Sequence, residues 1–473
     1  MEHRYKKLLS NSIVFTIGNF GSKVMQFVMI PIYSYTLNTD QFGKVDFITV
    51  LVSLLASLVC LDIQDAIFRF SLDKFENKGI IFSTGVIFTT IISALLLIAA
   101  IILNYIILEY PFFLITLLLI ANLFYGLLLN FVRAIGFVKP FAISGIINTF
   151  VMGALDILFL VCFHYGIEGY LWAMILGIIS GCIYICFVTH ISKFFNINNW
   201  NTHIFKRLIK YSFPLIPNTF SWWLNSVSDR FFIVLLVGAS ANGIYAMANR
   251  IPNMLSVLTG IFFQSWQMSA VEEYNKKDGS NFITNVLSYF ISFLFTGGIV
   301  ILSLIRPIFS VLLSRSYFEG WKLAPLLILV VIYSSLAGFI GTLYTASKKT
   351  IVIFYTTFIG AFINVALTLL LLKLIGIEGA AFANIISFAI VAFLRFKNMK
   401  KNKKIGLKLS KLILLHIEYL ILCGILFFVK NNLFVGIFGI IVLALQFLFD
   451  RELRATINFI FNKSKLLLTS KNN

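Results

Sequence analysis

The 473-residue chain has few charged residues. Asp, Glu, Lys and Arg make up 12% of it, whereas 59% of its residues are hydrophobic and its mean hydropathy is +0.94. A soluble protein of this length needs far more polar surface than this composition supplies. Apolar runs of about 20 residues recur instead, each long enough to cross a hydrocarbon core of about 30 Å. Two of them, 79–103 and 112–132, contain no charged residue.

The chain also lacks the residue patterns of catalytic and metal sites. It has no Gly-rich loop ending in Lys that could hold nucleotide phosphates, and no nucleophile, His and carboxylate set. The longest outer loop expected, 306–322, is too short for a catalytic domain. We therefore expect no enzyme activity, no metal and no cofactor. Five cysteines all fall in apolar spans and indicate neither a disulfide framework nor a zinc site: Cys60, Cys162, Cys182, Cys186 and Cys423.

The apolar runs predict an all-α, polytopic membrane protein with about fourteen transmembrane helices. Pro252 falls within the eighth span and is expected to loosen its backbone into a hinge. The expected spans are 11–36, 43–64, 80–105, 112–132, 141–164, 168–190, 211–237, 243–268, 283–304, 323–346, 350–372, 378–396, 409–429 and 432–449.

The formal net charge of +19 reflects topology rather than nucleic-acid binding. With a cytoplasmic N-terminus, about 29 of the 38 Lys and Arg residues fall on the cytoplasmic side and about six on the outer side. A basic cluster at 397–408 contributes strongly to this asymmetry. Both termini are therefore expected in the cytoplasm, and the basic residues are expected to face anionic lipid headgroups.

Two weak internal repeats divide the chain. An offset of 200 aligns Lys6 with Lys206 and Gly43 with Gly243, and an offset of 210 aligns Gly166-Ile167-Glu168-Gly169 with Gly376-Ile377-Glu378-Gly379. These repeats predict an N-terminal lobe, 1–195, with helices 1–6, and a C-terminal lobe, 196–400, with helices 7–12. Helices 13 and 14 and a cytoplasmic tail follow at 401–473. Parallel repeats of this kind are typical of transporters that work by alternating access.

Several blocks of sequence resemble polysaccharide repeat-unit flippases of the Wzx type, which belong to the multidrug/oligosaccharidyl-lipid/polysaccharide exporter superfamily. The resemblance extends over essentially the whole chain. Its blocks are Asn11-Ser12, Gly18-Asn19, Pro31-Ile32-Tyr33, Gln41-Phe42-Gly43, Phe213-Pro214-Leu215-Ile216-Pro217, Asp229-Arg230-Phe231-Phe232-Ile233, Gly243-Ile244-Tyr245, and Asn364 followed by Gly376-Ile377-Glu378-Gly379-Ala380-Ala381.

The resemblance implies a flippase of the bacterial inner membrane. Its cargo would be an undecaprenyl-pyrophosphate-linked oligosaccharide, moved from the cytoplasmic to the outer face for O-antigen or capsule assembly. A repeat-unit polymerase is an expected partner, and H⁺ or Na⁺ an expected coupling ion. A lipid II flippase is a close alternative, because that headgroup also bears a pyrophosphate. A multidrug/cation antiporter is a further alternative, although cationic drugs would be repelled by a basic cavity.

Ionisable residues at membrane depth are costly and are therefore functional candidates. Lys23 lies near the middle of helix one, on a polar face that also carries Asn19 and Gln26. Arg230 occupies the matching face of helix seven. A pyrophosphate removed from water needs several cations. We therefore expect a cationic substrate cavity lined by Lys23, Arg230, Arg250, Asn19, Gln26, Asn225 and Asn249.

Each of these deep charges also has a structural interpretation. Lys23 could pair with an aspartate, Asp229 and Arg230 could each find partners between helices, and Arg250 could extend to the outer surface. Asp156, on helix five, is expected to bind a coupling ion or proton or to pair with Lys23. Asp62 and Asp229 are the other candidates for coupling or ion pairing. Asp62 and Asp65 are expected on one face at the cytoplasmic end of helix two, where solvation among headgroups also accounts for them.

Overall fold

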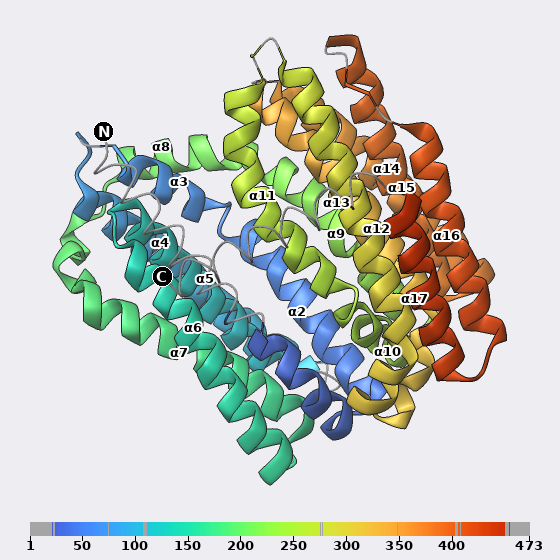
Figure 1. Ribbon diagram of the computed structural model, residues 1–473. Coiled ribbons are helices and arrows are strands. Elements are labelled where there is room, and N and C mark those ends of the chain that lie inside the picture. The colour runs from blue at the N-terminus through green and yellow to red at the C-terminus, as the bar shows by residue number, and fades with distance from the viewer. Residues whose placement is uncertain are drawn as a thin grey trace, which may run out of the picture. The chain divides into compact units, whose positions relative to one another are not determined.

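The computed structural model consists of helices joined by short turns (Figure 1). It describes residues 21, 24–73, 75–106, 111–274, 276, 278–347, 349–402, 405–406, 408–449 and 454, with some side chains inside helices left out. Within these residues there is no strand. The helical part of helix one that is described covers 24–36. The prediction of an all-α fold is confirmed.

The chain forms two compact units, 1–243 and 244–473. The predicted lobe boundaries after residues 195 and 400 stay predictions. The helices of the first unit are α2 (Thr39–Val59), α3 (Ile63–Ser71), α4 (Lys78–Ile106), α5 (Phe112–Ala134), α6 (Val138–Asp156), the π-helix η1 (Ile157–Cys162), α7 (Gly166–Thr189), the short 3₁₀ helices η2 (Ile191–Phe194) and η3 (Ile197–Asn199), α8 (Thr202–Ser212), η4 (Phe213–Leu215) and α9 (Ile216–Leu236).

One helix crosses the boundary between the units, and the rest of the chain belongs to the second. The crossing helix is α10 (Ala239–Arg250). The second unit continues with α11 (Asn253–Glu273), α12 (Gly279–Leu312), the 3₁₀ helix η5 (Arg315–Lys322), α13 (Ala324–Ala346), α14 (Thr350–Ile375), α15 (Ile377–Asn402), α16 (Leu409–Phe428) and α17 (Asn432–Phe449).

Ten of the described helices are long and apolar enough to span a membrane, and two shorter apolar segments accompany them. Large apolar side chains are exposed on their outer faces, such as Ile101 on α4 and Phe362 on α14, 64% and 72% exposed. Such exposure is unfavourable in water but suits contact with lipid. The chain is a multi-pass membrane protein, as its composition predicted.

Several helices differ in length from the predicted spans, such as α12, which extends to Leu312 where 304 was expected, and two predicted spans are interrupted. Helix two was expected to reach residue 64, but α2 ends at Val59, and Leu61 and Asp62 have positive φ angles of 51° and 50°. A non-glycine residue rarely adopts this left-handed conformation, and two in succession break the helix. Helix eight is divided into α10 and α11, with Pro252 capping the start of α11. The helix is thus interrupted at Pro252, and the hinge expected there stays a prediction.

The repeated Gly-Ile-Glu-Gly segments occupy equivalent turns within their own units. Gly166 begins α7 with φ +57°, and Gly376 ends α14 with φ +70°. Residues with a side chain adopt positive φ angles only rarely, so glycine is favoured at both turns. Each turn joins a tightly packed helical hairpin: α6 lies against α7, and α14 lies against α15 (Figure 1). The echo at offset 210 thus corresponds to a repeated structural element.

Candidate functional site

Arg230 forms an ion pair with an acidic residue that the sequence analysis did not single out. Its Nη1 donates to Asp46 Oδ1 at 3.0 Å, and the two side chains are 18% and 5% exposed. Asp46 Oδ2 also accepts from Asn242 Nδ2 at 3.3 Å. A carboxylate buried at this depth needs such donors to offset its lost hydration. This is the structural interpretation considered for Arg230, and contact with a substrate stays a prediction.

Asp229, next to Arg230 on α9, accepts a backbone hydrogen bond. Its Oδ1 accepts from the N–H of Arg230 at 2.9 Å, and its side chain is buried. Successive side chains on a helix point about 100° apart, so Asp229 and Arg230 lie on different faces of α9.

The beginning of α2 crosses the beginning of α10 at two glycines. A Cβ atom on Gly43 would lie 1.7 Å from the Ala239 carbonyl oxygen, and one on Gly243 would lie 1.9 Å from that of Thr39. The contact is reciprocal, because Thr39 and Ala239 are also separated by 200 residues. Asn242 Nδ2 adds a hydrogen bond to Gly43 O at 2.9 Å. Residues that the offset of 200 aligns therefore make two equivalent backbone contacts with each other.

Helices α2 and α9 run antiparallel and are joined by polar contacts along their length. Beyond Arg230 and Asp46, Trp223 Nε1 donates to Val50 O at 3.3 Å. At the far end, Thr219 Oγ1 donates to Asp62 Oδ2 at 2.9 Å. Arg230 and Thr219 are eleven residues apart on α9, or about 16 Å along its axis. Arg230 and Thr219, the partner of Asp62, therefore lie near opposite ends of α9, and Asp62 itself follows the end of α2.

The expectation that Asp62 and Asp65 lie on one face of helix two is wrong, because α2 ends before both. Asp62 precedes α3, and Asp65 lies in its first turn. Burial raises the pKa of the Asp65 carboxyl, the charge of Asp62 raises it further, and Arg133 lowers it. The break at Leu61 and Asp62 thus brings two carboxylates together at the end of a span.

A polar cavity of about 290 Å³ opens beside this break, within the first unit. Helices α2, α3 and α5 supply hydroxyl, amide and carboxyl groups. Asn122 Nδ2 donates to Leu118 O at 2.8 Å and Gln64 Nε2 to Leu123 O at 3.1 Å, which orients both amides. Its lining is Ser53, Ala56, Ser57, Cys60, Asp62, Gln64, Asn122, Tyr125 and Gly126. Such a set of donors and acceptors suits a polyhydroxylated ligand.

Asp156 lies at the end of α6, where the helix changes to the π-helix η1. Its side chain is fully buried, and Oδ2 accepts from Tyr33 OH at 2.7 Å. In the described part of the chain, Oδ1 has no hydrogen-bond partner. A buried carboxylate oxygen without a donor is costly unless a proton or cation satisfies it. A π-helical turn at such a residue is typical of functional positions.

The other predicted site residues are not gathered into one described cluster. Lys23 and Asn19 lie outside the described residues, as does the side chain of Asn225, so a pairing of Lys23 with Asp156 is not tested. Gln26 is exposed on helix one. Asn249 and Arg250 end α10 in the second unit, where both are half-buried.

The second unit contains buried polar residues that the sequence analysis did not treat as site candidates. Asn364 Nδ2 donates to Asn384 Oδ1 at 2.9 Å, and Asn384 Nδ2 to Tyr245 OH at 3.4 Å. On α15, the Arg395 guanidinium donates to Thr356 and Thr357 hydroxyls at 2.9 Å each and to Ala337 O at 2.8 Å. These contacts tie α13, α14 and α15 together. No cluster of metal-ligand type occurs among the described residues.

The fold is shared with solved transporters. A structure of the lipid II flippase MurJ in an inward closed conformation matches 93% of this chain and 99% of its own length, with 16% identity and a TM-score of 0.72. An inward-facing multidrug resistance MATE family transporter of the MOP superfamily matches 80% and 94%, with 12% identity and a TM-score of 0.59. The MATE transporter ClbM in complex with Rb⁺ matches 82% and 93%, with 14% identity and a TM-score of 0.53. Identities this low establish the fold alone.

The sequence itself identifies the family. No curated protein sequence matches the chain. The family model described as "Polysaccharide biosynthesis protein" matches residues 8–267, more than half of the chain and including α2 to α10 with the cavity and the Arg230–Asp46 pair. This chain therefore belongs to the polysaccharide biosynthesis protein family.

Proposed function

We propose that this protein is a flippase for undecaprenyl-pyrophosphate-linked oligosaccharide repeat units in O-antigen or capsular polysaccharide assembly. The observation that carries the proposal is the combination of a polysaccharide biosynthesis family with a fold shared by lipid and drug transporters. A transporter fold in such a family suggests a cargo that is made on one side of the membrane and used on the other. A sugar assembled on a lipid carrier in the cytoplasmic leaflet meets that requirement.

The polar cavity beside α3 supports the sugar part of this cargo. Its hydroxyls, amides and single carboxylate can exchange hydrogen bonds with sugar hydroxyls in either direction. Tyr125 adds an aromatic ring to the same wall. The volume of about 290 Å³ is near the lower end for ligand pockets, so one sugar unit rather than a whole repeat would enter it.

The deep cations support the pyrophosphate part. In this proposal Lys23, Arg230 and Arg250 neutralise the pyrophosphate, with Asn19, Gln26, Asn225 and Asn249 as polar neighbours. Before cargo binds, Arg230 already has a carboxylate partner, Asp46. A bound pyrophosphate would compete with Asp46 for the Arg230 guanidinium, so Arg230 would keep an anionic partner with and without cargo.

Transport would proceed by alternating access and be coupled to H⁺ or Na⁺. Asp156 is the proposed coupling residue, because its buried Oδ1 needs a proton or cation. Asp62 and Asp229 are secondary candidates. The protein would lie in the bacterial inner membrane with both termini in the cytoplasm and deliver its cargo to a repeat-unit polymerase.

The proposal is tested by deleting the gene and complementing with wild type, Lys23→Ala or Arg230→Ala. Wild type should restore surface polysaccharide and neither variant should; export is compared at equal membrane abundance, because Arg230→Ala also removes the ion-pair partner of the buried Asp46. Normal surface polysaccharide in the deletion strain would reject the assignment.

A second candidate, a lipid II flippase, is favoured by the structural similarity to MurJ. In that case deletion would stop cell-wall synthesis and cause lysis rather than the loss of surface polysaccharide. A drug antiporter would instead appear as a fall in drug resistance with both polymers intact.

A further inference from the structure

Several donor groups in the polar cavity beside α3 are already bonded within the protein. The Gln64 and Asn122 amide nitrogens both donate to backbone carbonyls of α5, at 3.1 and 2.8 Å. An amide that turns its nitrogen to the helix leaves its carbonyl oxygen to accept from a ligand. Ser53 Oγ likewise donates to a backbone carbonyl of α2 at 2.7 Å. The cavity therefore presents the oxygens of these side chains as hydrogen-bond acceptors.

Asp62 adds a negative charge to the cavity lining. Its Oδ2 accepts from Thr219 Oγ1 at 2.9 Å, a contact that uses one of the two carboxylate oxygens. Asp65 follows in the first turn of α3, and its carboxyl pKa is raised by burial and further by the charge of Asp62. The cation that lowers this pKa, Arg133, is exposed and stacks on Phe68, 4.1 Å from the ring centroid. A ligand that reaches Asp62 thus meets a carboxylate that can accept a further hydrogen bond.

Gly126 on α5 makes room for one of these acceptors. A Cβ atom on Gly126 would lie 2.2 Å from Gln64 Oε1, so the amide oxygen lies directly over the glycine at the cavity wall. A side chain at this position would push aside the end of a flexible side chain and not a backbone group. Gly126 therefore positions the Gln64 oxygen, and a methyl group there would displace it while leaving the helices in place.

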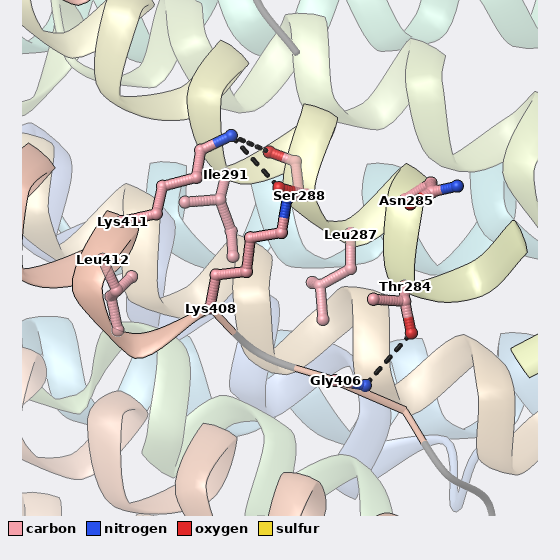
Figure 2. Close-up of a pocket in the computed structure, with 9 residues that line it drawn as sticks. All are labelled: Thr284, Asn285, Leu287, Ser288, Ile291, Gly406, Lys408, Lys411 and Leu412. Carbon is pink, nitrogen blue, oxygen red and sulfur yellow. Dashed lines mark hydrogen bonds between the residues drawn. The ribbon is translucent and has the colours of Figure 1, made fainter. Parts of the chain in front are cut away.

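A second pocket among the described residues lies within the second unit, between α12 and the start of α16 (Figure 2). Its polar contacts include Lys411, whose Nζ donates to Ser288 O at 3.2 Å and to Ser288 Oγ at 3.1 Å. Its enclosed volume is about 20 Å³, room for about one water molecule, against about 290 Å³ for the cavity beside α3. Of these two pockets, the cavity beside α3 is the one with room for a sugar ring.

We propose that the cargo sugar entering the cavity beside α3 is a neutral or amino sugar and that acidic sugars are excluded, an inference that rests on the proposed flippase function. Sugar hydroxyl or ammonium groups donate to Asp62, Gln64 and Asn122. A uronic acid instead places its carboxylate against these acceptors and leaves them unpaired. Two like charges about 4 Å apart weaken binding about fivefold even at the dielectric constant of water. Because the cavity is partly enclosed, about fivefold is the lower limit of this selectivity.

Saturation-transfer difference NMR on the purified full-length protein measures this selectivity, in a detergent without a sugar headgroup. The probes are methyl β-glucoside, methyl β-glucosaminide and methyl β-glucuronide, which share one ring and differ in charge. Wild type should bind the glucuronide at least about fivefold more weakly than the glucoside. Asp62→Asn should lose most of this difference, because the amide keeps an acceptor oxygen without the charge, and asparagine tolerates the positive φ at this position. Asp73→Asn, the same change at an exposed position outside the cavity, should behave as wild type.

Gly126→Ala tests the hydrogen bonds without changing the charge. Because its methyl group displaces the Gln64 amide, it should weaken binding of all three sugars about fivefold, the effect of one lost hydrogen bond. Equal binding of glucuronide and glucoside by wild type, an unchanged preference in Asp62→Asn, or wild-type affinity of Gly126→Ala would overturn the proposal. So would the absence of saturation transfer to all three sugars. The proposed function fails by a different result, unaltered surface polysaccharide in the deletion strain, so the two are tested separately.

Discussion

Arg230 on α9 and Asp46 on α2 form an ion pair with 3.0 Å between Nη1 and Oδ1, and Asp46 is almost fully buried. Removing one member of a buried pair leaves an uncompensated charge and typically costs about 3–5 kcal/mol. The pair joins two helices within the family-matched region. Stability and transport therefore both involve Arg230 and have to be separated by experiment.

A variant that exchanges the charges of Arg230 and Asp46 separates the effect on stability from the effect on transport. Arg230→Asp and Asp46→Arg alone should each reduce the amount of folded protein, and the combined variant should recover most of it, because the ion pair is re-formed. Surface polysaccharide should stay absent in the combined variant, because the guanidinium has moved to α2. Size-exclusion chromatography and surface glycan staining measure the two effects. Lys44→Ala, which removes the partly exposed ion pair with Asp40 on the same helix, is the control. Full export by the exchanged variant would show that Arg230 has a structural role alone.

Asp156→Asn should leave the protein folded but reduce export about tenfold or more. The asparagine side chain can still accept the hydrogen bond from Tyr33, whereas it cannot take up a proton or hold a cation as a carboxylate does. Tyr33→Phe removes the same hydrogen bond and keeps the carboxylate, so it should retain more export than Asp156→Asn. The rates would be measured in proteoliposomes with and without a proton or sodium gradient. If Asp156→Asn still responds to the gradient, Asp156 is not the coupling residue.

The polar cavity predicts a steric block. Ser57→Leu places an apolar side chain against Asp62, Gln64 and Asn122 and should abolish export while preserving protein levels. Thr90→Leu makes the same change at an exposed position on α4, outside the cavity, and should export normally. Equal export by both variants would remove the cavity from the proposed transport route.

Asp65 predicts a pH-dependent effect on stability. Its pKa is raised in the folded protein, chiefly by burial, so folding favours the protonated form. The stability that this provides is complete below the unfolded pKa of about 3.9 and is lost as pH rises through the folded pKa. Asp65→Asn should therefore raise the melting temperature at pH 7 by a small amount, because water still reaches part of the side chain and weakens the effect, and should have no effect near pH 3.5. The same shift at both pH values would contradict this.

The sequence was sufficient to predict where the helices lie, but not which side chains on different helices contact each other. Helical spans follow from runs of apolar residues, and most described helices begin and end within a few residues of prediction. The break after α2 was missed, because nothing in Cys60-Leu61-Asp62 has the composition of a turn. Asp46 was overlooked because it lies near the start of a span beside Lys44, where a charge needs no explanation. Its partner is 184 residues away, and only the packing of α2 on α9 brings them together.

Arg395 is a second charge whose contacts could not be predicted from its position in the sequence. It lies at the end of a predicted span, next to the basic cluster, and so counts among charges that set topology. In the structure its guanidinium is held by neutral hydroxyls and a carbonyl on α13 and α14. Position along a span does not distinguish a charge that faces headgroups from one that binds its neighbours.

The glycine crossing predicts that side chains are tolerated at one kind of glycine and not at another. Gly43→Val or Gly243→Val places atoms against a backbone carbonyl that cannot move aside, and each should sharply lower the yield of folded protein. Gly145→Val, on α6 with no atom within 4 Å of the added Cβ, should be tolerated. Detergent-extracted yield and melting temperature would measure the difference. Wild-type yield of Gly43→Val would contradict the close approach.

Because each glycine meets the residue four positions before the other, the two form a single joint and not two separate contacts. Once one side chain has forced the helices apart, the second meets open space. The destabilisation of Gly43→Val/Gly243→Val should therefore fall well below the sum of the single effects, in contrast to two independent sites. The two copies of the repeat therefore share one close contact, which a side chain on either glycine would disrupt.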